Sequence, residues 1–538
     1  MQLDSLTNSK SNDHLIGNHH FNNLIEVIES CSGCYSLIYW HDDETLIDSY
    51  SAIQREAFEL SKGLSPKTNG ERIGLIAEMN REFIIRFFAC QYAGIAPAIL
   101  PIPNLNLQEW YTNIEYMLNE AKCPTLWLGS NFKKENFPTN IRCKIINDQT
   151  VLSQIKNKQA NGEKTENDSG KFPVNDTAYI QFTSGTSGAP KGICITHEAL
   201  MTNIRETQLE GLSLTRADKC ISWLPFYHDM GLVGFGLAPF FVKSEQHHLS
   251  TKSFMRNPLR WLTLISDYQL TLTFAPNFAY EQLGKIDPTK IPETLNLSTW
   301  RVAGIGAEKI YPTVLERFFE TYKDYGFNLD AFYPSYGMAE AVLAICIRNP
   351  KDALFKPDSP DISCGEILPN LATKIADDGE ILIKGITVAT HYANGELVPK
   401  TDDGYYRTGD IGFFKGRELY ITGRKKECII INGRNIWPEH VEQALENIIP
   451  ITISYLVTPL TFEGKETIGV VLAKQDWDQD EMKKINEDCM NQIFELTGAS
   501  SQCFFITEQH LLKTSLGKLS RLATAKSIQN REISFVTL

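Results

Sequence analysis

The stretch from Tyr179 to His197 constrains the fold more than any other part of the chain. An apolar run leads into small and hydroxyl-bearing residues, and a second apolar run begins after Pro190-Lys191-Gly192. Two strands joined by a loop this poor in side chains leave backbone N–H groups free to form an anion-binding concavity. The hydroxyls and the Lys191 ammonium suit phosphate. The stretch therefore predicts a phosphate-binding loop, and the alternative is a Ser- and Gly-rich surface turn.

This loop differs from the common phosphate-binding loop of nucleoside triphosphatases. That pattern needs a second Gly directly before the Lys, and a Ser or Thr directly after it. Here Pro190 precedes Lys191 and Gly192 follows it. Because no hydroxyl stands where it could hold Mg²⁺, a metal used by this protein must be held by another part of the chain.

The segment T-S-G-T-S-G-A-P-K-G resembles the nucleotide loop of the adenylate-forming ligase superfamily, which includes acyl-CoA synthetases and fatty acyl-AMP ligases. Ser187 stands where that family more often has Thr, and both residues supply a hydroxyl. The resemblance implies that the loop binds the phosphates of ATP, with Lys191 in a catalytic role and with nucleotide contacts from Thr183, Ser184, Gly185, Thr186, Ser187 and Gly188.

The length and composition of the chain limit the classes of function that it can have. The length of 538 residues predicts roughly three domains. The net charge of −13 argues against nucleic-acid partners and anionic membranes, which both favour a basic surface. The longest apolar stretch, 83–103, is interrupted by Arg86, Gln91 and Pro97, so we expect no transmembrane segment. Twelve scattered cysteines, with one C-x-x-C pair and no zinc-site spacing, favour reduced thiols in a cytoplasmic protein.

Hydrophobic patterning predicts parallel sheets. Residues 71–100 read as strand, helix and strand, and a second such unit covers 110–128. Residues 156–176 are polar and charged, so we expect a solvated loop that leads into the phosphate-binding loop.

An aromatic and apolar run with a single His and a single Asp follows from Cys220 to Val242. Its residues alone fit either a buried helix with a core histidine or the wall of an apolar cavity with His228 at the polar mouth. The segments W-L-P-F-Y-H-D-M-G-L-V-G and F-A-P-N-F-A-Y resemble the acyl-pocket segments of fatty acyl-AMP ligases. This resemblance implies a catalytic role for His228 and acyl contacts from Trp223, Phe226, Gly231 and Phe278. No ammonium partner is apparent, which disfavours amino acids as substrates.

Further motifs resemble the base, ribose and metal sites of the same superfamily. A Tyr beside a Gly offers a flat face for a base, and a carboxylate can accept hydrogen bonds from a ribose diol. The resemblance implies that Tyr336 and Gly337 contact adenine, with Gly306 and Ala307 at its border. It also implies that Asp410 and Arg424 bind the ribose and that Glu340 holds Mg²⁺. Taken alone, Glu340 could equally be a carboxylate that interacts with the dipole at the start of a helix. Asp410 could equally be an ordinary residue of a tight turn.

The C-terminal motifs complete the resemblance. It implies that a small domain rotates about Lys426 and carries the catalytic Lys518, which lies in L-K-T-S-L-G-K-L-S-R. We therefore expect an α/β protein in two parts. A large N-terminal domain, 1–426, would contain two α/β lobes and a distorted β-barrel, and a mobile α+β domain would cover 427–538.

The expected activity follows from the resemblance. A fatty acid and ATP, with Mg²⁺, would form acyl-AMP and pyrophosphate, and an acyl carrier protein would then receive the acyl group on its phosphopantetheine thiol. Only 43 positions separate Tyr336 from Gly379, which leaves no room for the inserted segment that distinguishes fatty acyl-AMP ligases from acyl-CoA synthetases. Transfer to CoA is therefore the alternative. A nucleotide-binding protein that has lost catalysis is a third reading, which the presence of Lys191, Glu340, Asp410 and Lys518 disfavours.

Overall fold

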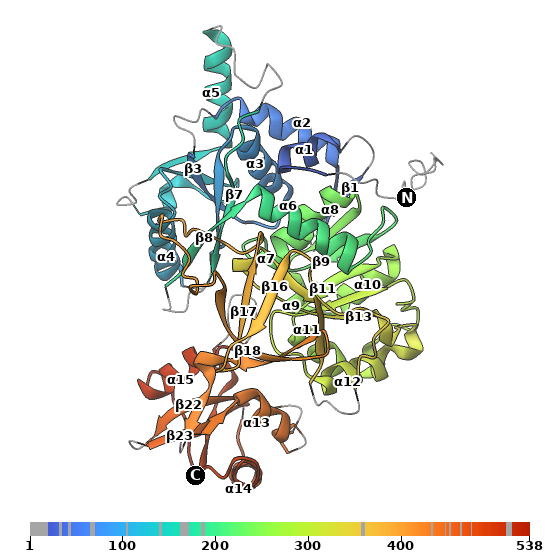
Figure 1. Cartoon of the computed structure of the whole chain (residues 1–538), viewed down its shortest axis with the longest axis vertical. Coiled ribbons are helices and arrows are strands. Elements are labelled where there is room, and N and C mark those ends of the chain that lie inside the picture. The colour runs from blue at the N-terminus through green and yellow to red at the C-terminus, as the bar shows by residue number, and fades with distance from the viewer. Residues whose placement is uncertain are drawn as a thin grey trace.

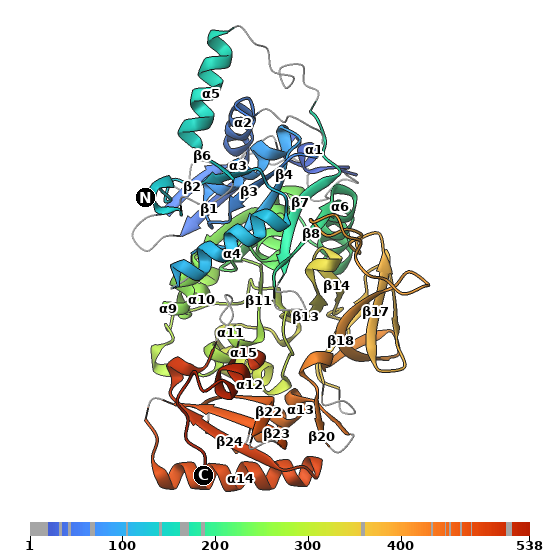
Figure 2. The same ribbon diagram turned by 90° about the vertical axis from the view of Figure 1, so that its left-hand side faces the viewer.

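The protein folds as two α/β lobes stacked on a smaller C-terminal body (Figures 1 and 2). The computed structural model describes residues 20–31, 35–40, 45–64, 70–103, 106–138, 143–161, 172–183, 189–356, 361–431, 434–446, 448–450, 453–462, 465–474, 476–512 and 519–538.

The first lobe is built on a six-stranded sheet with the order β6-β5-β3-β4-β7-β8. The pairs β3–β4 and β3–β5 are parallel, which confirms the two expected strand–helix–strand units. Helix α5 continues to Ala160, so the first part of the segment expected as a solvated loop is helical. The elements of this lobe are β3 (Arg72–Ile76), α3 (Arg81–Tyr92), β4 (Ala96–Leu100), α4 (Leu107–Glu120), β5 (Thr125–Leu128), β6 (Lys144–Asn147), α5 (Asp148–Ala160), β7 (Thr177–Thr183), β8 (Lys191–Thr196) and α6 (His197–Arg205).

The second lobe uses the parallel half of a thirteen-stranded sheet, in the order β13-β12-β11-β9-β10-β1, with β2 antiparallel at the edge. Its parallel strands are short and mostly buried, as expected for a parallel sheet covered on both faces, whereas the edge strand β2 is largely exposed. Its elements are α1 (Leu24–Glu29), β1 (Ser36–Trp40), β2 (Thr45–Ser49), α2 (Tyr50–Ser61), β9 (Lys219–Ser222), α7 (Asp229–Gly231), α8 (Ala238–Val242), β10 (Glu245–Leu249), α9 (Thr251–Arg256), α10 (Leu259–Tyr268), β11 (Leu272–Ala275), α11 (Asn277–Gly284), β12 (Val302–Ile305), α12 (Pro312–Tyr322) and β13 (Phe332–Gly337).

The remaining strands of this sheet form an antiparallel half, in the place of the expected distorted barrel. Four of its pairings shift register at bulges, and bulges bend and twist a sheet. This half joins the second lobe directly, because β13 pairs with both β12 and β14. Its strands are β14 (Ala344–Ile347), β15 (Ser363–Ile367), β16 (Leu371–Ile375), β17 (Glu380–Gly385), β18 (Tyr406–Lys415) and β19 (Glu418–Arg424).

The C-terminal body has its own hydrophobic cores, whose described members begin at Ile429 and are separate from the core of the second lobe. One of these cores includes both Leu511 and Ala525. The domain boundary at Lys426 stays a prediction. The elements of the body are β20 (Ile429–Ile431), β21 (Arg434–Ile436), α13 (Pro438–Leu445), β22 (Ser454–Phe462), β23 (Lys465–Ala473), α14 (Gln479–Thr497), β24 (Ser501–Ile506) and α15 (Arg521–Gln529).

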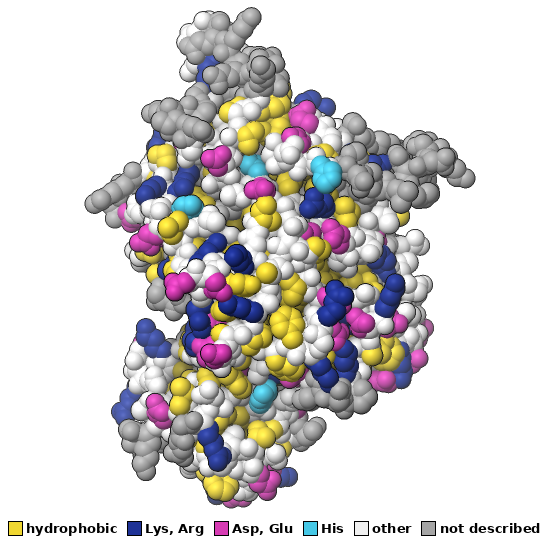
Figure 3. All heavy atoms as spheres, viewed as in Figure 1, with side chains coloured by type: hydrophobic (Ala, Val, Ile, Leu, Met, Phe, Trp, Pro, Cys, Tyr) yellow, Lys and Arg dark blue, Asp and Glu magenta, His cyan; other side chains and the backbone are white. Residues whose placement is uncertain are grey.

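The described surface carries charges of both signs. On the face in Figure 3, Lys and Arg side chains alternate with Asp and Glu. In the described part of the chain, no helix combines the length and hydropathy that a membrane span needs.

Candidate active site

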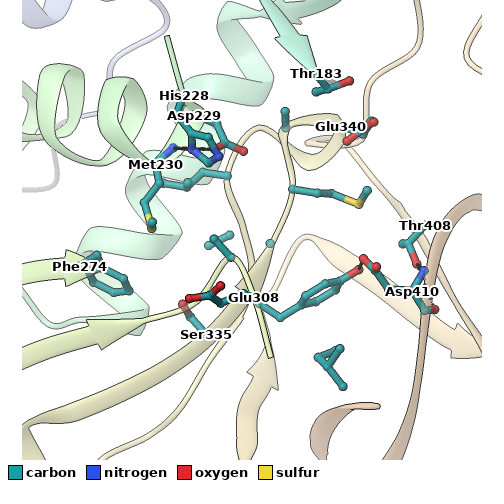
Figure 4. A pocket seen from close by; sticks show the side chains of 18 of the residues that line it. Thr183, His228, Asp229, Met230, Phe274, Glu308, Ser335, Glu340, Thr408 and Asp410 are labelled. Carbon is teal, nitrogen blue, oxygen red and sulfur yellow. Dashed lines mark hydrogen bonds and ion pairs between the residues drawn. The ribbon is translucent and has the colours of Figure 1, made fainter. Parts of the chain in front are cut away.

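A cavity of about 680 Å³ lies where the two lobes, the antiparallel half-sheet and the C-terminal body meet. Its lining falls into two arms. Figure 4 shows Phe274 on one side of the cavity, with Thr408 and Asp410 on the other. We call the side with Phe274 the apolar arm and the side with Thr408 and Asp410 the polar arm. The apolar arm includes Phe235, Leu272, Phe274, Leu343 and Ile347, and the polar arm includes Tyr336, Glu340, Asp410, Arg424, Glu427, Glu439 and Arg521.

The expected phosphate-binding loop joins β7 to β8. These strands pair in antiparallel register, and Thr183 lies opposite Lys191 at the open end. Thr183 lines the cavity, whereas the Lys191 ammonium lies 4.8 Å from the centre of the Tyr392 ring. A contact between a cation and an aromatic face is weak, so a bound anion such as a phosphate could draw this ammonium away from the ring. The residues from Ser184 to Gly188 lie outside the described residues.

Asp410 is the centre of the polar arm. Its side chain is buried, and Oδ2 accepts a hydrogen bond of 2.7 Å from the Tyr336 hydroxyl. Its Oδ1 lies 2.9 Å from Nε of Arg424, the residue opposite it in the β18–β19 ladder. Burial, together with the Asp410 charge, raises the pKa of Tyr336, so the phenol stays a hydrogen-bond donor. Three residues that were predicted separately therefore form one contiguous group.

Small residues around this group let neighbouring backbone segments lie close together. Ala307 lines the cavity with a φ of 67°, in the left-handed region that few residues other than Gly adopt. A side chain at Gly337 would lie 1.8 Å from the Leu343 carbonyl oxygen, and one at Gly306 would lie 2.9 Å from Ser335. Gly337 lines the cavity. Gly306, which is not among the lining residues, instead lets β12 and β13 approach each other.

Glu340 lies on a short turn directly after β13. Burial raises the pKa of its carboxyl, and the charges of Asp229 and Asp410 add to this effect. Its anion is therefore destabilised where it lies, and a nearby cation would relieve that destabilisation. No cluster of three or more His, Cys, Asp or Glu side chains that could hold a metal occurs among the described residues. A single carboxylate fits Mg²⁺ when substrate phosphates supply further oxygens.

The turn that carries Glu340 is strained. Val342, fully buried, has φ 71° and ψ −61°, and the N–H of Leu343 donates to the carbonyl of Ala341 across 2.9 Å. This is the rare γ-turn with a left-handed centre, which a β-branched residue adopts only when its surroundings impose it. Asn203 of α6 imposes it here. Its side chain donates to the carbonyls of Ala341 (3.4 Å) and Ala344 (2.8 Å) and accepts from the Ala344 N–H (3.3 Å).

His228 lies at the cavity wall, at the start of α7. Its Nδ1 lies 2.5 Å from Oδ1 of Asp229 and accepts a 3.3 Å hydrogen bond from the N–H of Met230. The N–H of Met230 donates to the same carboxylate oxygen across 2.7 Å. Nδ1 is thus engaged, and Nε2 of His228, which has no partner among the described residues, is left for a ligand.

The four residues expected to contact the acyl chain do not line the cavity. Trp223 stacks on Phe254 with ring centres 3.9 Å apart and also contacts Phe278, and Phe226 packs against Phe83. A side chain at Gly231 would lie 2.2 Å from the Pro225 carbonyl oxygen. These residues support the wall from behind. The apolar surface is formed instead by neighbours in the same segments, namely Met230, Gly234, Phe235 and Phe274.

The hinge region and the C-terminal body complete the cavity. Lys426 lines it, and its neighbour Lys425 lies 2.7 Å from Asp378 and 3.1 Å from Glu380 of the half-sheet. Lys518 lies outside the described residues, but Leu519 and Arg521 line the cavity. Sequence reasoning missed Glu439 and Arg521, which lack a local motif and meet only through the fold.

Comparisons with known proteins agree with this architecture. The model of the family "AMP-binding enzyme" matches residues 36–393. A protein of Caulobacter vibrioides named as an acyl-CoA synthetase is 32% identical over 514 residues, which is 88% of each chain. The medium-chain-fatty-acid–[acyl-carrier-protein] ligase JamA of Moorena producens is 28% identical over 94% of each chain. A solved structure from a study of fatty acyl-adenylate ligases of E. coli and L. pneumophila superposes with a TM-score of 0.81 at 27% identity, covering 95% of this chain and 98% of that one. The chain therefore belongs to the family of AMP-binding enzymes.

Proposed function

We propose that this protein activates a fatty acid as acyl-AMP and then passes the acyl group to the phosphopantetheine thiol of an acyl carrier protein. One observation carries the proposal. A single cavity joins the polar arm around Asp410 to the apolar arm around Phe235 and Phe274. A nucleotide in the first arm and an alkyl chain in the second could bring their reacting groups together beside His228 and Glu340.

The relatives support this substrate class and this acceptor. JamA is named for a medium-chain fatty acid and an acyl carrier protein, and so is the ligase TtuA of Teredinibacter turnerae, which is 30% identical over 417 residues. The structural neighbour comes from a study of fatty acyl-adenylate ligases.

The first half-reaction is a nucleotidyl transfer. A carboxylate oxygen of the fatty acid attacks the α-phosphorus of ATP, the bond from that phosphorus to the bridging oxygen breaks, and pyrophosphate leaves with the electron pair. The protein contributes positioning and charge neutralisation. In this proposal Asp410 accepts hydrogen bonds from the ribose hydroxyls, Tyr336 offers its ring to adenine, and Lys191 and Lys518 offset negative charge.

We also propose that Glu340 holds Mg²⁺ against the phosphates. The raised pKa of this buried carboxyl supports the assignment, because a cation would favour its ionised form. When bound, the ion would neutralise phosphate charge. The Asn203 clamp on the γ-turn holds Glu340 in place for this role.

The second half-reaction needs a different arrangement of the C-terminal body. Leu519 and Arg521 line the cavity here, which supports an arrangement suited to adenylation. Rotation about Lys426 would then withdraw Lys518. The thiol gives up its proton, its sulfur attacks the acyl carbonyl carbon, and the bond from that carbon to the AMP oxygen breaks.

CoA is the alternative acceptor. Between Tyr336 and Gly379 the described residues contain only a short turn and the strands β14, β15 and β16, with no added helix. The relative from Caulobacter vibrioides is named as an acyl-CoA synthetase. Offering CoA and a phosphopantetheinylated carrier protein separately to the enzyme with preformed acyl-AMP would decide between them.

ATP–pyrophosphate exchange tests the adenylation itself. We expect exchange with medium- or long-chain fatty acids and little with amino acids, because Phe235, Leu272 and Phe274 give this arm an apolar surface that suits an alkyl chain. Faster exchange with any amino acid than with every fatty acid would overturn the proposed function. We further propose a cytoplasmic location, which fits the eleven described cysteines, all of them free thiols.

A further inference from the structure

Two polar side chains line the cavity on a turn that packs against Ile347 of the apolar arm. Thr207 and Gln208 line it, and each is only 4% exposed. The Thr207 hydroxyl has no hydrogen-bond partner in the described part of the protein. The Gln208 side-chain amide likewise makes no hydrogen bond to a described residue. The mechanism proposed above uses neither group.

A π-helical turn brings these residues to the cavity. The N–H of Leu212 donates to the carbonyl of Thr207 across 3.0 Å, a link of five residues that is typical of such a turn, which covers Glu206–Gly211. Glu206 takes no part in the lining, and its carboxylate accepts a 3.2 Å hydrogen bond from the backbone N–H of Asn370. The turn therefore sends one polar residue into the half-sheet and the next two into the cavity.

The surroundings of Gln208 within the cavity are apolar. Leu212, Leu272 and Ile347 also line the cavity, and Leu212 follows the same turn. Gly211 makes room for Ile347, since a side chain there would lie 2.8 Å from its Cδ1 atom. No charged side chain of the described residues pairs with the Gln208 amide, and the backbone carbonyl of Gln208 is already used by the N–H of Leu214, 2.8 Å away.

An unsubstituted alkyl chain is a poor match for this wall. Such a chain would displace water from a nearly buried amide and leave its donors and acceptor unsatisfied. A hydroxyl or keto oxygen at that depth would supply the missing partner, because an amide both donates and accepts. Sites built to bond a substrate hydroxyl discriminate strongly against analogues that lack it.

We propose that the acyl substrate carries an oxygen substituent, a hydroxyl or a keto group, on its alkyl chain, and that Gln208 hydrogen-bonds this oxygen with Thr207 beside it. Gln208 is then a specificity-determining residue. This inference rests on the proposed function and narrows its substrate class from fatty acids to oxygenated fatty acids.

A scan of substituent position on the full-length protein tests the inference. ATP–pyrophosphate exchange is measured with an unsubstituted fatty acid, at the chain length that gives the fastest exchange, and with its hydroxy and oxo derivatives, the oxygen moved one carbon at a time. We expect one position, or two adjacent ones, to raise kcat/KM about tenfold or more over the unsubstituted acid. The hydroxy and oxo series distinguish the two substituents.

Gln208→Leu is the matching variant, with Thr207→Val as the second. Either substitution should abolish the preference by raising kcat/KM for the unsubstituted acid and lowering it for the preferred derivative. Gln159→Leu, the same change on the exposed surface of α5, should leave the preference unchanged. The wild-type scan decides the question by itself if a variant does not fold.

The outcomes separate the two proposals. Efficient exchange with unsubstituted acids, with no gain from an oxygen at any position, would overturn this inference and leave the proposed function standing. An equal preference for the oxygenated acid in Gln208→Leu and in the wild type would also overturn this inference and leave the proposed function standing. Absence of exchange with every fatty acid, substituted or not, would overturn the proposed function and this inference with it.

Discussion

The hydroxyl of Tyr336 donates a 2.7 Å hydrogen bond to Oδ2 of Asp410, linking β13 to β18 across the polar arm of the cavity. Arg424 holds the other carboxylate oxygen. The carboxylate proposed to bind the ribose is thus oriented by the residue proposed to contact the base. Substitution of either one should disturb the same nucleotide site.

Removing the Asp410 carboxylate should weaken ATP binding. Asp410→Ala is expected to raise KM for ATP about tenfold or more, because a hydrogen bond to a charged group contributes about 1.5–3 kcal/mol. The preference among fatty acids should not change. Steady-state adenylation assays at varied ATP measure both quantities. A folded Asp410→Ala protein with an unchanged KM for ATP would remove Asp410 from the nucleotide site.

The ring and hydroxyl of Tyr336 can be separated. Tyr336→Phe keeps the ring and loses the bond to Asp410, whereas Tyr336→Ala loses both. We expect KM for ATP to rise about threefold to tenfold in the Phe variant and further in the Ala variant. Equal effects of the two substitutions would mean that the ring does not contact the base.

The two half-reactions should depend on different lysines. Lys518→Ala is expected to slow acyl-AMP formation about a hundredfold to a thousandfold, since it removes a preorganised charge. Transfer from synthetic acyl-AMP to a thiol should be spared. Lys426→Pro should spare adenylation and block transfer, because proline fixes φ at the proposed hinge. Equal slowing of both half-reactions by Lys518→Ala would contradict the two arrangements.

Asn203 does not line the cavity, yet it should influence the Mg²⁺ concentration that adenylation needs. Asn203→Ala leaves the carbonyls of Ala341 and Ala344 without these bonds, so the γ-turn can relax and displace Glu340. We expect the Mg²⁺ concentration for half-maximal adenylation to rise about tenfold. Asn119→Ala, on the exposed face of α4, is the control. Unchanged Mg²⁺ dependence in folded Asn203→Ala would show that the clamp serves stability alone.

Glu439 should make the stability of the protein depend on pH. Burial raises the pKa of this carboxyl to about 7, although the Arg521 guanidinium opposes the shift. Between its ordinary pKa and about 7, the folded state binds more protons than the unfolded state, so Glu439 lowers stability as pH rises through that window.

The corresponding variant is Glu439→Gln, which cannot ionise. Its unfolding free energy relative to the wild type should increase from about pH 5 to about pH 8, by on the order of 2 kcal/mol. Denaturant titrations at several pH values measure this difference. A constant difference between variant and wild type across the range would show that Glu439 does not titrate there.

Local sequence patterns predicted the hairpin that forms one side of the candidate site. The hairpin that brings Thr183 opposite Lys191 follows from two apolar runs flanking a loop. The structure brings Tyr336, Asp410 and Arg424 together, and their nucleotide contacts stay a prediction; the 2.7 Å bond between the first two was not foreseen. The loop residues Ser184–Gly188 and Lys518 lie outside the described residues, and their roles stay predictions.

The acyl arm was harder to predict because the backbone there departs from regular helical spacing. Leu232–Leu237 forms a π-helical turn, in which the N–H of Ala238 donates to the carbonyl of Val233. Such a turn shifts the face that later residues present, so a helical period cannot tell which aromatic side chains reach the cavity. Thr207 and Gln208 escaped notice for the same reason, since an isolated polar pair in a helical segment usually faces solvent.

One hydrophobic core of the C-terminal body contains both Leu511 and Ala525, which flank Lys518 in the sequence. We therefore expect the proposed withdrawal of Lys518 to require a movement of the whole C-terminal body. Tyr311 of the second lobe and Glu442 of α13 hold the two parts together through a 2.9 Å hydrogen bond. In the proposed mechanism, the choice between the two half-reactions would be a docking equilibrium between two folded bodies. Its position can be tuned at an interface remote from the bound acid, without altering any atom that touches ATP.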